Sequence, residues 1–201
     1  MFWSFVVASI LIELTPGPNM TWLAVLGAAR GKTTALAAVA GVALGLAIAA
    51  VVAGLGLTAL LLELPVLFEA LRWAGTFYLF YLAWDAWRDS STEIDNTQAT
   101  TGVAFRQGLI SNVLNPKAYL FYAAMLPQFI SGNTSLAAEI ALLSAVYVAV
   151  ATIIHSGIAI LSGSMATFLQ TSPHAVTIRK GLAILIAIAA CWFFYATKLS
   201  G

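Results

Sequence analysis

Charged residues are scarce in this chain of 201 residues. Lys, Arg, Asp and Glu together make up 8% of it, whereas soluble globular proteins carry about 25%. Hydrophobic residues account for 61%, and the mean hydropathy is +0.94. A soluble chain of this size covers its surface with polar groups, and so few charges cannot do that. The composition therefore indicates an integral membrane protein and excludes a soluble enzyme, a secreted disulfide scaffold and a disordered tail.

Several chemical features are also missing. The net charge is only +1, so the chain has no basic surface for nucleic acid. Cys191 is the single cysteine and lies in an apolar run, which predicts a free thiol buried in a helix. The sequence has no HExxH, no paired acidic metal motif, no Ser/His/Asp grouping and no nucleotide-binding loop. These absences argue against an enzyme, a cofactor, a metal site and ATP as the direct energy source.

Six stretches are long and apolar enough to cross a bilayer, which takes about 20 helical residues. They are Phe2–Ala28, Ala35–Leu62, Val66–Trp87, Phe105–Ile130, Leu136–Leu161 and Ile178–Thr197. Only helices and closed barrels span lipid, and runs this long and apolar are not barrel strands. The sequence predicts an all-α membrane protein with six transmembrane helices in a single domain, residues 1–201. The longest polar connection, 88–101, separates halves of approximately 1–87 and 102–201.

Lysine and arginine residues gather on one side of the predicted bundle. The residues flanking the first, third and fifth connections are Arg30, Lys32, Arg88, Arg106, Arg179 and Lys180. The opposite side has Arg72 and Lys198, and Lys117 lies inside the fourth span. Because Lys and Arg accumulate on the cytoplasmic side, loops 1, 3 and 5 are predicted to be cytoplasmic and both termini to lie outside.

Two spans contain proline motifs that interrupt a helix. The motifs are Glu13-Leu14-Thr15-Pro16-Gly17-Pro18-Asn19 in the first span and Asn112-Val113-Leu114-Asn115-Pro116-Lys117-Ala118 in the fourth. Proline removes a backbone donor and clashes with the preceding turn, so no regular helix continues through them. Each motif lies in the first helix of a three-helix half, and an odd number of helices inverts the second half. The sequence predicts two inverted three-helix repeats with helices 1 and 4 broken, and matched breaks of this kind point to a transport site.

Irregular backbone at membrane depth lines a cavity or is buried in protein. The free N–H groups that follow Pro18 and Pro116, together with Lys117, offer positive charge to a carboxylate. The Glu13 carboxylate, the free carbonyl groups and nearby amides accept hydrogen bonds from an ammonium group. The predicted substrate is therefore a small zwitterion such as an amino acid. The residues predicted to bind it are Thr15, Pro16, Gly17, Pro18, Asn19, Asn112, Asn115, Pro116 and Lys117.

Ionisable residues inside a membrane span are costly and indicate a function. Glu13 is predicted to carry the coupled proton; a structural pair with Lys117 and snorkelling toward the interface are the alternatives. His155 is the second candidate for proton coupling, with a hydrogen-bonded packing role as the alternative. Lys117 either binds the substrate carboxylate or neutralises Glu13.

Two acidic residues in the third span have an arginine three residues later, a spacing that predicts ion pairs on one helix. Asp85 is followed by Arg88, and Glu69 by Arg72. We expect the first pair at the interface, with a transport role for Asp85 as the alternative, and the second pair in solvent.

Glycine pairs spaced four residues apart are typical of closely packed membrane helices. Gly27 and Gly31 form one such pair, and Gly41 and Gly45 form another. Tight contacts within the bundle are expected from them. A homodimer is compatible with the spacing but is not indicated by it.

The proline motifs resemble those of the lysine exporter and homoserine–threonine resistance (LysE/RhtB) family. The TPGPN at 15–19, followed by Gly31, is similar to that family's first-helix signature. The run FRQGLISNVLNPKAYLFYAAMLPQF at 105–129 is similar to its fourth-helix segment, and residues 75–84 are similar to its third helix. The resemblance implies a bacterial inner-membrane exporter of amino acids or close derivatives, driven by the proton gradient. Glu13 and Asp85 depart from the family pattern.

The leading interpretation is therefore a proton-coupled secondary transporter that exports a small amino acid or derivative by alternating access. Its expected partners are the zwitterionic substrate, protons and the lipid bilayer. A channel would need a repeated filter loop or a charged ring, and a structural membrane subunit would not account for matched broken helices. These two remain the alternatives, and a membrane-embedded enzyme is less favoured.

Overall fold

The computed structural model describes residues 1–56, 63–89 and 97–197, and every regular element within them is a helix. The α-helices are α1 (Phe2–Leu14), α2 (Pro18–Arg30), α3 (Lys32–Gly54), α5 (Pro65–Asp89), α6 (Thr97–Val113), α7 (Pro116–Leu120), α8 (Leu136–Ser164), α9 (Ala166–Thr171) and α10 (Ala175–Ala196). A π-helical turn, η1 (Phe121–Met125), and a 3-10 turn, η2 (Leu126–Phe129), follow α7. The described residues therefore confirm the all-helical prediction.

Three helical stretches are long and apolar enough to cross a membrane, and they correspond to the second, fifth and sixth predicted spans. They are α3, α8 together with α9 to Leu169, and α10. The first and fourth predicted spans are divided into shorter helices, and α5 carries charged residues at both ends. The end of the second predicted span, residues 57–62, lies outside the described residues.

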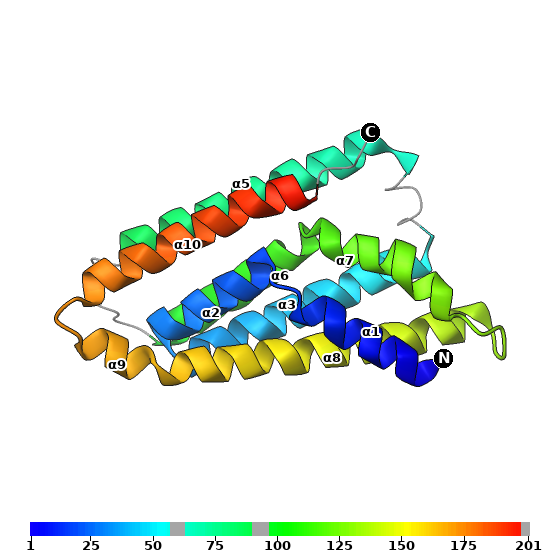
Figure 1. The fold of residues 1–201 in the computed structure, drawn as a ribbon, viewed down its shortest axis with the longest axis horizontal. Coiled ribbons are helices and arrows are strands. Elements are labelled where there is room, and N and C mark those ends of the chain that lie inside the picture. Colours follow the sequence, from blue (N-terminus) through cyan, green and yellow to red (C-terminus); the bar gives the residue numbers. More distant parts are fainter. Residues whose placement is uncertain (57–62, 90–96, 198–201) are drawn as a thin grey trace.

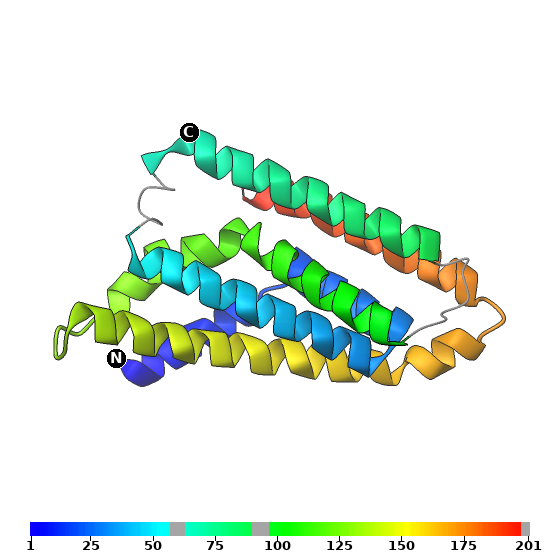
Figure 2. The same cartoon turned by 180° about the vertical axis from the view of Figure 1, so that it is seen from behind.

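The helices pack side by side in an elongated bundle. α5 and α10 form a pair along one edge, and α3 packs against both α6 and α8 (Figures 1 and 2). α2 contacts α8 and α10, while α1 lies against α8. Because α1 and α2 contact different stretches of the same long helix, the break between them faces α8.

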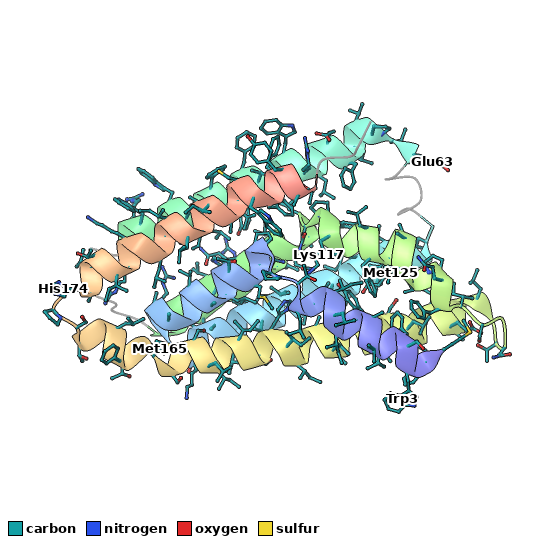
Figure 3. The ribbon with its side chains drawn as sticks, in the orientation of Figure 1. Trp3, Glu63, Lys117, Met125, Met165 and His174 are labelled. Atoms are coloured by element: carbon teal, nitrogen blue, oxygen red, sulfur yellow. The ribbon has the colours of Figure 1, made fainter. Side chains whose placement is uncertain are left out.

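The described residues that flank the first, third and fifth predicted connections lie at one end of the bundle, where Arg30 is near Asp85. His174, before α10, lies at this end, and Glu63 and Trp3 lie at the opposite end (Figure 3). The contacts agree, because the Nζ of Lys180 on α10 lies 5.2 Å from the centre of the Trp87 ring on α5. Lys117 lies between the two ends (Figure 3).

Helix occupies part of the connection predicted at 88–101. α5 continues to Asp89 and α6 begins at Thr97. Residues 90–96 lie outside the described residues, as does Lys198, which was predicted on the opposite side. Cys191 is free and exposed on α10, so the prediction that it is buried was wrong. In a bundle surrounded by lipid, an apolar position on a helix indicates nothing about burial.

Glycines bring the backbones of α3 and α6 into direct contact. A Cβ atom added to Gly41 would lie 2.0 Å from the carbonyl oxygen of Phe105, and one added to Gly108 would lie 2.2 Å from that of Ala38. Gly27 is equally close to α8, where its Cβ would meet Ser162 at 2.1 Å. The predicted tight contacts are therefore confirmed within the bundle.

Gly31 has a different role from the other paired glycines. Its φ of +87° is in a region that L-residues with a side chain rarely adopt. It lies between α2 and α3, where the chain reverses direction with a single residue outside helix. Glycine is thus required here by the backbone turn, and no close helix contact is involved.

Candidate functional site

The first proline motif separates α1 from α2. α1 ends at Leu14, Thr15 is extended (φ −65°, ψ 117°), and α2 begins at Pro18 with Gly17 as its N-cap. Proline at the first helical position is favourable because its missing N–H would have no partner there. The chain therefore leaves helix for three residues, as the motif predicts.

The second proline motif separates α6 from α7. α6 ends at Val113, and α7 begins at Pro116. The side-chain oxygen of Asn115 accepts a hydrogen bond from the backbone N–H of Lys117 at 3.0 Å and so caps α7. Asn115 thus stabilises the break itself, and both predicted interruptions are present.

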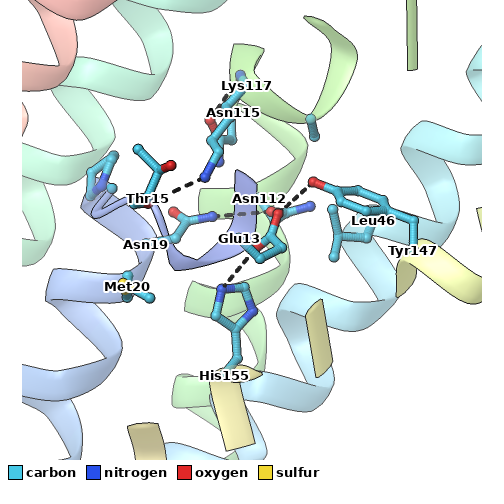
Figure 4. Close-up of a pocket in the computed structure, with 13 residues that line it drawn as sticks. Glu13, Thr15, Asn19, Met20, Leu46, Asn112, Asn115, Lys117, Tyr147 and His155 are labelled. Carbon is cyan, nitrogen blue, oxygen red and sulfur yellow. Dashed lines mark hydrogen bonds and ion pairs between the residues drawn. The ribbon is translucent and has the colours of Figure 1, made fainter. Parts of the chain in front are cut away.

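Amide side chains connect the two breaks directly. The Nδ2 of Asn19, at the start of α2, donates to the Oδ1 of Asn112 on α6 at 3.0 Å (Figure 4). The hydroxyl of Ser111 donates to the Oδ1 of Asn19 at 2.6 Å. Residues more than 90 positions apart therefore form one buried polar chain, which joins the two predicted halves.

Lys117 on α7 makes a second connection, with the carboxyl end of α1. Its Nζ donates to the carbonyl oxygen of Ile12 at 2.8 Å and to that of Thr15 at 3.5 Å. The last carbonyl groups of a helix have no partners within it and carry partial negative charge. The ammonium group thus donates its hydrogen bonds to the end of α1, and the Glu13 carboxylate acts on it electrostatically without a hydrogen bond between the two.

The Glu13 carboxylate faces α8 and is only 6% exposed. Its Oε1 accepts a hydrogen bond from the hydroxyl of Tyr147 at 2.5 Å, and its Oε2 lies 3.4 Å from the Nε2 of His155 (Figure 4). The Glu13 carboxylate therefore does not snorkel toward the interface. Glu13 and His155, both predicted for proton coupling, are in direct contact.

A pocket lies where the two breaks meet, and we call it the break pocket. It holds about 390 Å³ of space not filled by atoms, part of which is open to the outside. Its lining residues are Glu13, Thr15, Gly17, Pro18, Asn19, Met20, Leu46, Asn112, Asn115, Lys117, Ala118, Tyr147 and His155. Two residues predicted to bind substrate, Pro16 and Pro116, do not line it and contribute by breaking the helices.

Four lining residues were not identified from the sequence: Met20, Leu46, Ala118 and Tyr147. Tyr147 had a detectable signal, because Tyr147, Ala151 and His155 follow each other at intervals of four on one face of α8. All three are buried. The other three have no such signal, since an apolar residue in a membrane helix gives the same sequence pattern whether it lies in the core, in a pocket or against lipid.

Two polar atoms of the lining residues are buried without a hydrogen-bond partner. They are the Nδ2 of Asn112 and the Nδ1 of His155. A buried polar group without a partner costs about 1–3 kcal/mol. Two residues of the pocket lining therefore each carry a polar atom that makes no hydrogen bond with the described residues.

The acidic residues of α5 make contacts beyond their own helix. Asp85 accepts a hydrogen bond from the Nε2 of Gln107 on α6 at 2.9 Å and lies 4.0 Å from the Nη2 of Arg30 on α2. Asp85 therefore connects α5 with both α6 and α2. The predicted pair with Arg88 on the same helix does not include these contacts. These residues lie outside the break pocket.

The predicted pair of Glu69 and Arg72 is confirmed, with 2.6 Å between the Oε2 and Nη2 atoms. The prediction that it is solvated was wrong for the arginine, which is 5% exposed. Arg72 also donates to the carbonyl oxygen of Phe194 at 3.2 Å, and its guanidinium lies 4.3 Å from the centre of that residue's ring. It joins α5 to α10.

Comparison with known proteins finds relatives that include two efflux proteins. A homoserine/homoserine lactone efflux protein of Salmonella typhi is 29% identical over 190 residues, 93% of this chain and 92% of that protein. A leucine efflux protein of Enterobacter sp. (strain 638) is 28% identical over 193 residues, 93% of this chain and 91% of that protein. An uncharacterized membrane protein of Pseudomonas aeruginosa is 35% identical over 137 residues, 64% of this chain and 63% of that protein. No solved structure matches.

A family model supports the same conclusion over nearly the whole chain. The model described as LysE type translocator matches residues 10–197, a range that includes both breaks and all residues lining the break pocket. The resemblance inferred from the two proline motifs is thereby confirmed. The chain belongs to the LysE type translocator family and is a transporter, not an enzyme.

Proposed function

We propose that this protein is a secondary active transporter that exports a small amino acid or amino-acid derivative across the bacterial inner membrane. Membership of a translocator family and the efflux proteins among its relatives support the exporter class. The observation that carries the proposal is the break pocket. It presents a carboxylate, an ammonium group and amide side chains to one small volume midway along the bundle.

The pocket has complementary groups for both ends of a zwitterion. A substrate carboxylate would accept from the free Nδ2 of Asn112 and from the N–H groups at the start of α2. A substrate ammonium would donate to Glu13 or to the carbonyl oxygen of Thr15, where it would compete with Lys117. In this scheme Lys117 holds the end of α1 until substrate arrives and then binds the substrate carboxylate, which is one of the two roles predicted for it.

Transport proceeds by alternating access of two inverted halves in this proposal. The first half contains α1, α2, α3 and α5, and the second half contains α6, α7, α8 and α10. The contacts of Asn19 with Asn112 and of Lys117 with α1 cross between the halves at the two breaks. Rocking of one half against the other would open and close these contacts in turn.

The coupled ion is a proton in this proposal, taken up and released at Glu13 with His155 as its neighbour. The end of the bundle that carries Arg30, Lys32 and Lys180 faces the cytoplasm, because Lys and Arg accumulate there. Substrate then enters from that end. Both chain termini lie on the outer side.

The proposal is tested by measuring export from cells. Cells producing the wild type, Glu13→Gln or Glu63→Gln are loaded with mixed dipeptides, and the amino acids that accumulate outside are identified. We expect one or a few amino acids to accumulate with the wild type and with Glu63→Gln, which changes an exposed carboxylate at the far end of the bundle. We expect Glu13→Gln to abolish this export while the protein remains folded.

If no amino acid or derivative accumulates outside to a greater extent than with cells that lack the protein, the proposal is contradicted. Wild-type pH dependence in Glu13→Gln would contradict the coupling role alone. Lys117→Ala separates its two roles: a weaker apparent affinity for the exported amino acid supports contact with substrate. Unchanged affinity with lower thermal stability would leave Lys117 as a structural cap of α1.

A further inference from the structure

Tyr147 contacts Glu13, and neither the proline motifs nor the proposed transport mechanism assigns it a role. It lies on α8 two helical turns before His155 and, like His155, lines the break pocket. Its hydroxyl donates to the Oε1 of Glu13, and the Nε2 of His155 lies 3.4 Å from the Oε2 (Figure 4). One face of α8 thus meets both oxygens of a carboxylate that belongs to α1.

Packing fixes the position of the Tyr147 hydroxyl. The side chain is 1% exposed. Its ring is stacked on Phe121, with 3.6 Å between the ring centres and an interplanar angle of 11°. The ring of Tyr122 lies edge-on at 5.6 Å. A ring held on two sides leaves its hydroxyl little freedom, so this donor is ordered before any substrate binds.

The Glu13 side chain has more freedom of its own than the tyrosine ring. It has three rotatable bonds, and a carboxylate has about four sites that accept hydrogen bonds. His155 and Lys117 line the same pocket, and both act on this carboxylate electrostatically. The hydroxyl of Tyr147 therefore decides which carboxylate oxygen is held by the protein, and this oxygen is Oε1.

The ammonium group of Lys117, which also lines the pocket, is directed to the backbone. Its Nζ donates to the carbonyl oxygens of Ile12 and Thr15 at the end of α1. Since Tyr147 occupies Oε1 and Lys117 is bound to carbonyl groups, the Oε2 of Glu13 is the charged acceptor that an ammonium group entering the pocket would meet. Charge-assisted hydrogen bonds of this kind are the strong ones, and their strength depends on geometry.

We propose that Tyr147 is a positioning residue for substrate recognition: by holding the Oε1 of Glu13, it directs the Oε2 into the break pocket to receive the ammonium group of the substrate. The inference rests on the proposed function and adds to it the group that orients the partner of the ammonium. A carboxylate that is already oriented binds without the entropic cost of ordering its side chain. Recognition of the ammonium end therefore depends on Tyr147, and recognition of the carboxylate end does not.

The test compares amino acids with analogues that lack only the ammonium group. Purified protein in detergent is titrated by calorimetry with L-leucine and its analogue isocaproate, and with L-homoserine and its analogue γ-hydroxybutyrate. In Tyr147→Phe the ring and its stacking are kept and the hydroxyl is removed. The Kd for the amino acid should rise about tenfold, the value of one hydrogen bond to a charged group, while the Kd for its analogue should change by less than about twofold.

Selectivity between amino acid and analogue is a readout that a merely structural role would not move. Equal weakening of both ligands in Tyr147→Phe, or no weakening of either, overturns the proposal. The matched control is Tyr122→Phe, which removes a neighbouring hydroxyl that donates to the carbonyl oxygen of Leu46 at 3.3 Å and not to Glu13. It should keep the wild-type selectivity, and an equal loss there also overturns the proposal. Should Tyr147→Phe fail to fold, Phe121→Leu keeps the hydroxyl but removes its stacking surface; selectivity should then fall by a smaller factor, and unchanged selectivity overturns the proposal.

A second measurement needs no substrate. Thermal unfolding is followed for Tyr147→Phe, for Glu13→Met, which keeps a side chain of similar length but removes its acceptors, and for the double variant. Because either substitution breaks the same contact, the change in melting temperature of the double variant should differ from the sum of the two single changes. Tyr122→Phe combined with Glu13→Met should be additive. If the wild type binds neither amino acid, the proposed export of these compounds fails, and the cycle still decides the role of Tyr147, since additive changes overturn it.

Discussion

Replacing Gly41 by alanine tests the packing that positions the site. In a helix interior alanine is favoured over glycine by about 1 kcal/mol, so propensity alone predicts a more stable protein. The structure predicts the opposite. The new Cβ would lie 2.0 Å from the carbonyl oxygen of Phe105 and 2.8 Å from the backbone nitrogen of Leu109.

The clash cannot be relieved by a side-chain rotation, because both neighbours are backbone atoms of α6. The two helices must separate until the 2.0 Å contact reaches about 3.4 Å, where ordinary van der Waals contact begins. Overpacking of this kind costs about 1–3 kcal/mol. Because the neighbouring atoms are rigid backbone, the cost should be at the upper end of this range. Subtracting the gain in helix propensity leaves a net loss of about 2 kcal/mol in the free energy of unfolding. That loss corresponds to a melting temperature lower by about 4–8 °C for a chain of this length.

The assay is thermal unfolding of purified protein in detergent, followed by circular dichroism at one fixed scan rate. Gly157→Ala is the matched control, because it makes the same change within α8 at a position where the new Cβ meets nothing within 4 Å. Gly157→Ala should melt at or above the wild-type temperature. If Gly41→Ala melts as high as Gly157→Ala, the close approach of α3 and α6 is not a feature of the folded protein.

Three further predictions follow from single contacts. Gly45→Ala would place its Cβ 2.9 Å from that of Asn112. The free energy of binding of the exported amino acid should therefore fall by more than the free energy of unfolding; equal losses in the two free energies would contradict this. Glu139 accepts hydrogen bonds from four backbone N–H groups of the loop that begins at Ser131, so Glu139→Gln should speed amide hydrogen exchange there, and unchanged exchange would refute it. Arg72→Met removes the partner of a carboxylate and of a carbonyl group and should lower the free energy of unfolding by about 1–3 kcal/mol; an unchanged melting temperature would argue against it.

The positions of the breaks were predictable because proline acts within one turn of its own helix. Pro18 and Pro116 each begin a helix, and the preceding residues are extended, as the local rule requires. Most of the residues predicted to bind substrate line the break pocket for the same reason, since they are neighbours of the prolines in the chain. The predicted binding role itself awaits the export experiment.

The partners of the polar side chains were not predictable to the same extent. Lys117 donates hydrogen bonds to carbonyl groups at the end of α1, Asp85 contacts two other helices, and Arg72 is buried against α10. Each of these contacts joins residues that are distant in sequence. Spacing along one helix predicts neighbours three or four residues away and contains no information about which face of another helix lies opposite.

By itself the sequence determined that the chain is an all-helical membrane protein, that two of its helices are broken, and to which family it belongs. Proline acts on its own helix and composition is a sum over the whole chain, so the effect of neither depends on how the helices pack. Only the tertiary structure decided that Tyr147 and His155 hold Glu13 and that Asn19 joins Asn112. In a soluble protein the apolar face of a helix would have indicated its core, but here large side chains such as those of Val66 and Phe168 are exposed where lipid would surround them. Because lipid and core are equally apolar, the packing of helix against helix had to be seen.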